Sequence, residues 1–140
     1  MGPEAAMAES PGIHLSRISQ IAVTVKDVKR ATAFYRDVFG LHLLFEAPGG
    51  GGGLSFFDAG GVRLMLATAP SPEFDHPASI LFFDVDDIAR AHEELVSRGV
   101  VFVEKPHMIA RLPDRDVWIA SMRDSEENVM ALMSEPRRAE

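Results

Sequence analysis

Apolar and polar residues alternate along residues 18–25, and the pattern then changes to a helical spacing. One set of alternate positions is apolar and the other polar or small: Ile21, Val23 and Val25 against Gln20, Ala22 and Thr24. This period of two is typical of a strand that buries one face. Asp27 follows where a helix N-cap is expected, apolar residues recur at helical spacing over 28–38, and Gly40 is suited to end the helix. The pattern predicts a strand followed by a helix.

The same unit occurs a second time at residues 80–100, ILFFDVDDIARAHEELVSRGV. Val85, Asp87, Ile88 and Gly99 there correspond to Val25, Asp27, Val28 and Gly40. Further strands are expected at 42–46, 54–58 and 62–68 after the first unit, and at 100–103, 115–122 and 128–134 after the second. Residues 104–113 are expected to form a long loop, a possible functional lid. The repeat therefore predicts two modules of β-α-β-β-β order.

The predicted organisation is one domain with two short tails. Residues 1–14 are interpreted as a disordered tail or a remnant of cloning, and residues 135–140 as a second tail. The modules are assigned to 15–68 and 79–134, joined by a proline-rich linker at 69–78. A single helix covers only one face of each sheet, so the other face must meet something else. We expect an α+β fold in which curved sheets face each other, or a partner chain's sheet, around a cavity that holds a ligand.

Composition excludes several classes of function. The 140 residues contain 14 Lys and Arg against 21 Asp and Glu, a net charge of −7, which argues against a nucleic-acid partner. There is no cysteine, so disulfides, thiol nucleophiles and thiolate metal sites are excluded. Neither a long apolar run nor a signal-peptide pattern is present, so we expect a cytoplasmic protein with no membrane partner.

The repeat resembles the vicinal oxygen chelate superfamily, the glyoxalase, bleomycin-resistance and extradiol-dioxygenase group. The segments that carry this resemblance are IAVTVKDVKRATAFYRDVFGL, FFDAGGVRLML, FFDVDDIARAHEELVSRGV and MRDSEENVMALM. It implies a glyoxalase-like fold and a homodimer. It also implies a looser final turn, because Ser125 and Glu127 stand where the family often has proline and glycine.

The resemblance also locates where the metal enzymes of the superfamily carry their ligands. Those four positions hold Gln20, Met65, Ile80 and Ala131 in this chain. Only Gln20 offers a donor atom, whereas metal sites of nitrogen and oxygen ligands need three or more. We therefore expect a branch of the superfamily that lacks the metal ligands, with no cofactor.

The leading hypothesis is a metal-independent protein that binds a small organic molecule in an apolar cavity, with no catalytic residue assigned. The expected ligand-binding residues are Gln20, Arg63, Met65, Ile80, Phe82, His107, Arg111, Trp118 and Ala131. Two of these have other interpretations: Arg63 as a side chain that extends to the rim or pairs internally, and Trp118 as a core or dimer-interface residue. The alternative function is a lyase, isomerase or oxygenase of the same superfamily with an atypical or re-sited metal.

Overall fold

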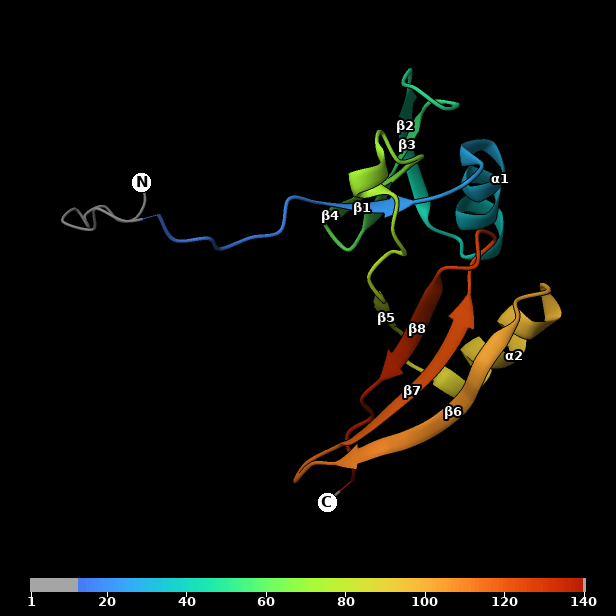
Figure 1. Ribbon diagram of the computed structural model, residues 1–140. Helices are drawn as coiled ribbons and strands as arrows, with labels where there is room; N and C mark the ends of the chain where they lie inside the picture. Colours follow the sequence, from blue (N-terminus) through green and yellow to red (C-terminus); the bar gives the residue numbers. More distant parts are fainter. Residues whose placement is uncertain (1–12, 140) are drawn as a thin grey trace.

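The computed structural model describes residues 13–139 as two four-stranded sheets, each with one helix against it (Figure 1). The expected tail at residues 1–14 lies almost wholly outside the described residues. The first sheet contains β1 (Gln20–Thr24), β2 (His42–Ala47), β3 (Leu54–Ala59) and β4 (Val62–Ala67). The second contains β5 (Phe82–Asp84), β6 (Phe102–Arg111), β7 (Asp116–Arg123) and β8 (Val129–Ser134). The α+β fold and the β-α-β-β-β order of both halves are confirmed.

Both sheets have the same topology. Their strand orders are β1-β4-β3-β2 and β5-β8-β7-β6, and in each the first strand pairs in parallel with the last strand of its module. Gln20 is the cross-strand partner of Arg63 in the first sheet, and Phe82 is the partner of Ala131 in the second. The repeat in the sequence is therefore a repeat of structure.

The two helices begin as the sequence predicts. α1 (Val28–Ala33) and α2 (Ile88–Ser97) are capped by Asp27 and Asp87, whose carboxylates accept the amide of the third helical residue at 3.0 and 3.1 Å. α1 continues as a π-helix, η1 (Phe34–Val38), and the segment between the two sheets contains a short 3-10 helix, η2 (Pro72–Phe74). No helix within residues 13–139 combines the length and apolar composition needed to cross a membrane.

One hydrophobic core runs through both modules on the helix side of the sheets. Val23 and Val25 are buried there as expected, and the largest fully buried side chains include Tyr35, Phe57 and Met122. Burying each such side chain contributes roughly 1.5–3 kcal/mol. The turn between β7 and β8 lies beside α1 (Figure 1), so the end of the second module contacts the start of the first.

The prediction of a lid loop at residues 104–113 is wrong. β6 continues as a strand from Phe102 to Arg111, paired with β7. Its register with β7 shifts at three places, and Pro106 falls within one of them. An edge strand with bulges tolerates proline and loses the regular alternation, which is why the sequence pattern resembled a loop.

Candidate functional site

The face of the first sheet opposite α1 carries a polar and aromatic cluster that we call the first open face. It is defined by Gln20 on β1, Arg63 and Met65 on β4, Phe56 on β3 and Phe45 on β2. The register places them together, because Gln20 is paired with Arg63, Met65 with Phe56, and Phe56 with Phe45. Paired residues on adjacent strands share a face of the sheet. Three of the predicted ligand-binding residues, Gln20, Arg63 and Met65, are therefore neighbours.

The side chains of the first open face contact one another. Arg63 Nε donates to Gln20 Oε1 at 2.8 Å, and Gln20 Nε2 lies 3.7 Å from Met65 Sδ. The Arg63 guanidinium carbon lies 5.7 Å from the centre of the Phe56 ring, within range of a cation–π interaction. The Phe45 and Phe56 rings are stacked with centroids 4.5 Å apart. The face offers an ordered hydrogen-bond donor beside an aromatic surface.

The corresponding face of the second sheet, which we call the second open face, carries both apolar and polar residues. Two rows of paired residues cross it: Phe82, Ala131, Ser121 and Glu104, and then Asp84, Met133, Ile119 and His107. Ser121 Oγ donates to Glu104 Oε1 at 3.0 Å, and His107 Nδ1 lies 2.7 Å from the Lys105 carbonyl oxygen. Predicted residues Phe82, Ala131 and His107 thus lie on one surface, with His107 held by a strand instead of a mobile lid.

Three predicted site residues are placed differently from the expectation. Trp118 is paired with Ser134 and lines a pocket with Ile88 of α2, so it lies on the helix-covered face and not on the second open face. Arg111 lies in strand β6, not in a lid, and its Nε is 3.6 Å from an Asp116 carboxylate oxygen. Ile80 precedes β5 and is exposed.

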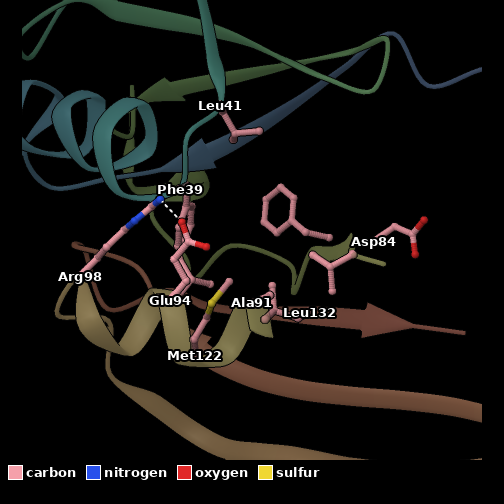
Figure 2. A pocket seen from close by; sticks show the side chains of 11 residues that line it. Phe39, Leu41, Asp84, Ala91, Glu94, Arg98, Met122 and Leu132 are labelled. Atoms are coloured by element: carbon pink, nitrogen blue, oxygen red, sulfur yellow. Dashed lines mark hydrogen bonds and ion pairs between the residues drawn. The ribbon is translucent and has the colours of Figure 1, made fainter. Parts of the chain in front are cut away.

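The two open faces do not enclose a common cavity within one chain, which corrects the expectation of a cavity closed by the chain's own two sheets. None of the five main pockets in residues 13–139 is lined by side chains of both faces. A pocket of about 340 Å³ does lie where the modules meet, but on the helix side (Figure 2). Its lining is mainly apolar and includes Phe39 and Leu41 from the first module and Met122 and Leu132 from the second, with the Glu94–Arg98 ion pair at its edge.

The profile of the Glyoxalase/Bleomycin resistance protein/Dioxygenase superfamily matches residues 17–111. The chain belongs to this superfamily. A search of curated proteins found no significant match.

Solved structures of the superfamily share the fold. An antibiotic binding protein from Streptomyces sp. CB03234, TnmS3, is 25% identical with a TM-score of 0.70, covering 89% of this chain and 100% of its own. A lactoylglutathione lyase from Agrobacterium tumefaciens is 27% identical with a TM-score of 0.60, covering 86% and 94%. A superfamily member from Sphaerobacter thermophilus DSM 20745 is 19% identical with a TM-score of 0.71, covering 86% and 98%. Because binding proteins and enzymes both occur among these structures, the residues of the site must discriminate between them.

The residues at the positions that the resemblance assigned to metal ligands are mostly apolar. Of the four positions that the resemblance assigned to ligands, those occupied by Met65, Ile80 and Ala131 lack a nitrogen or oxygen side-chain donor. The fourth residue, Gln20, already bonds to Arg63. Within residues 13–139, no three histidine, cysteine or carboxylate residues are grouped so that they could hold a metal ion.

Sequence reasoning missed a buried polar network at the turn between β7 and β8. Glu126, whose side chain is only 1% exposed, accepts the amides of Lys26 and Asp27 at 2.9 and 3.0 Å and pairs with Arg30 at 2.8 Å. Burial favours the neutral acid, but the hydrogen bonds from Arg30, Asp27, Ser125 and Lys26 outweigh it and lower the Glu126 pKa to about 2.

A second acid of this turn bonds to the π-helix. Tyr35 Oη donates to Asp124 Oδ2 at 2.7 Å, while Asp124 Oδ1 accepts the amides of Glu126 and Asn128. Burial, together with the neighbouring Asp124 carboxylate, raises the pKa of Tyr35. The expected looseness of this turn is therefore wrong: Ser125 and Glu127 replace the family's proline and glycine, but buried hydrogen bonds hold the turn to the first module. Carboxylates in a short acidic segment usually indicate solvent exposure, so no sequence pattern indicated these contacts.

Proposed function

We propose that this superfamily member is a metal-independent binding protein for a small organic molecule, with the two open faces as its binding surface. The observation that carries the proposal is the chemistry of the positions that the resemblance assigns to metal ligands: Met65 gives the first open face an apolar side chain, and Ala131, which is buried on the second open face, offers no donor atom either. Phe45 and Phe82 enlarge that surface, since they are 49% and 51% exposed. Apolar walls with a few convergent polar groups are typical of small-molecule sites.

The binding protein is proposed to work as a homodimer. Large apolar side chains are exposed on both open faces, among them Phe45 and Phe82, and an interface between two copies would bury them. The two open faces of one chain do not meet, whereas a second copy would set its second open face against the first open face of its partner. A ligand would then lie between two sheets from different chains.

The alternative is a lyase, isomerase or oxygenase with a re-sited metal. It is favoured by the identity to the Agrobacterium tumefaciens lactoylglutathione lyase, and by the titratable residues His107 and Glu104 on the second open face. These two would need a third donor from the partner chain to hold a metal.

Two measurements separate the functions. Elemental analysis of the purified protein is expected to give well under one transition metal per chain, and added chelator is expected to leave the melting temperature unchanged. Screening by thermal shift is expected to find small organic molecules that raise the melting temperature without being converted, as followed by mass spectrometry. Near one metal per chain, with loss of stability on chelation, would refute metal independence and favour the enzyme hypothesis. Native mass spectrometry over a dilution series tests the dimer, and a monomer at all micromolar concentrations would refute it.

A further inference from the structure

The guanidinium of Arg63 has unused hydrogen-bond donors. An arginine carries one N–H on Nε and two on each Nη. Nε donates to Gln20 Oε1, but neither Nη group forms a hydrogen bond or ion pair with any residue of the described chain, 13–139. Asp58, the cross-strand partner of Arg63, accepts the amide of Gly61 and forms no ion pair with Arg63. The four Nη hydrogens are available to an acceptor that comes from outside the chain.

Two contacts hold this guanidinium in place. Gln20 accepts from Nε on one side, and the Phe56 ring lies 5.7 Å from the guanidinium carbon on another. Gln20 is itself oriented by its contact with Met65 Sδ. An exposed arginine ordinarily loses side-chain entropy when it binds a ligand, and fixing it beforehand reduces that cost. The guanidinium group is therefore already ordered before a ligand binds.

An aromatic surface adjoins the guanidinium group. Phe56 is only 9% exposed, being covered by Phe45, whereas Phe45 is 49% exposed. A flat ring can stack on the accessible part of Phe45, since offset stacking is favourable between aromatic rings. The two Nη groups point two parallel donors at a planar acceptor, the geometry that a carboxylate satisfies best.

We propose that the first open face recognises a planar aromatic acid, whose ring stacks on Phe45 and whose carboxylate accepts hydrogen bonds from both Nη groups of Arg63. This inference rests on the proposed binding function and names the chemistry of its ligand. A fused bicyclic acid carries the flat ring and the carboxylate in one rigid molecule. A neutral amide of the same shape satisfies fewer of the donors, and a saturated acid loses the stacking.

The test uses the full-length protein with three probes: 2-naphthoate, its neutral analogue 2-naphthamide, and the saturated decalin-2-carboxylate. Affinity is measured by calorimetry, and the place of binding by NMR of ¹³C-labelled methionine methyl groups. Met65 reports on the first open face and Met130, which is fully buried, on the core. We expect 2-naphthoate to bind most tightly and to shift Met65 but not Met130.

The variants separate the two contacts. Arg63→Met should lower the affinity for 2-naphthoate about tenfold and the affinity for 2-naphthamide far less, because only the acid forms charge-assisted hydrogen bonds with Arg63. Phe45→Leu should lower the affinity for both aromatic probes by roughly threefold or more. Arg90→Met, which removes an exposed arginine from α2, is the matched control and should change neither affinity.

Several results would overturn the inference. It fails if 2-naphthoate leaves the Met65 signal unmoved, if Arg63→Met behaves like Arg90→Met, or if Arg63→Met alters dimerisation and leaves affinity unchanged. In each case the proposed binding function is tested separately, by adding a set of neutral organic compounds and following the methionine methyl signals. Binding that shifts Met65 or Met133 would retain the function without the aromatic acid, and no binding at either methyl would refute both.

Discussion

The charge on Glu126 should be a main source of stability for the contact between the two modules. Its carboxylate is almost completely buried and accepts five hydrogen bonds, from the amides of Lys26 and Asp27, from Arg30 through two nitrogens, and from Ser125. Glu126→Gln keeps the size of the side chain but turns one of its oxygens into an amide group that faces donors. The substitution should therefore leave unpaired donors in the buried turn.

The pKa gives the magnitude and the sign of the effect. Folding lowers the pKa of Glu126 from 4.5 to about 2, which corresponds to ~3 kcal/mol of stability. Because the folded-state pKa is depressed, this contribution is complete above the ordinary value and is lost as the pH falls from 4.5 towards 2. We expect Glu126→Gln to be ~3 kcal/mol less stable than the unmodified protein at about pH 7.

Urea unfolding followed by circular dichroism, at fixed protein concentration, measures the difference. Between about pH 7 and about pH 3 the gap between the two proteins should narrow by ~2 kcal/mol, because the unmodified protein loses the contribution of the charge. Glu127→Gln, in the same turn but exposed, is the control and should change stability by less than ~0.5 kcal/mol. A gap that stays constant with pH, or a Glu126→Gln protein as stable as its parent, would refute the reasoning.

Two further predictions concern backbone conformation. Glu127 has a φ of 70°, a conformation that is strained for any residue except glycine. Glu127→Gly should therefore stabilise the protein by ~1 kcal/mol in thermal unfolding, whereas Glu127→Ala should give no gain. A loss of stability in the glycine variant would contradict the assignment of strain. Gly51 has a φ of 72°, and a Cβ there would overlap the Thr68 hydroxyl, so Gly51→Ala should cost ~2 kcal/mol. Gly50→Ala, where a Cβ meets nothing, should be nearly neutral, and equal effects at the two glycines would show that the loop does not hold this conformation.

Much of the fold could be predicted from the repeat. The alternation at Ile21, Val23 and Val25 and the caps at Asp27 and Asp87 are local signals, and the backbone near them follows those signals directly. β6 could not be predicted, because bulges and Pro106 remove the alternation that identifies a strand.

The site was predicted in part for the same reason. Gln20, Arg63 and Met65 lie on short regular strands, where the alternation of apolar and polar residues predicts which face each side chain occupies. The structure places all three on the same face of the first sheet. For Trp118 the sequence left open a ligand-binding role and a core or dimer-interface role, and the pairing of β7 with β8 places it on the helix-covered face. The residues that join the modules, Asp124 and Glu126, are acids in a turn, and their burial depends on contacts with a helix about a hundred residues earlier.

That contact between the last turn and the first helix has a consequence for how the chain unfolds. Glu126 and Asp124 tie residues near the end of the chain to Arg30 and Tyr35 near its beginning. If either repeat unfolds alone, Glu126 and Asp124 lose their hydrogen-bond partners in the other repeat. A fragment comprising only the first repeat should consequently remain unstructured, and the intact chain should melt in a single cooperative step.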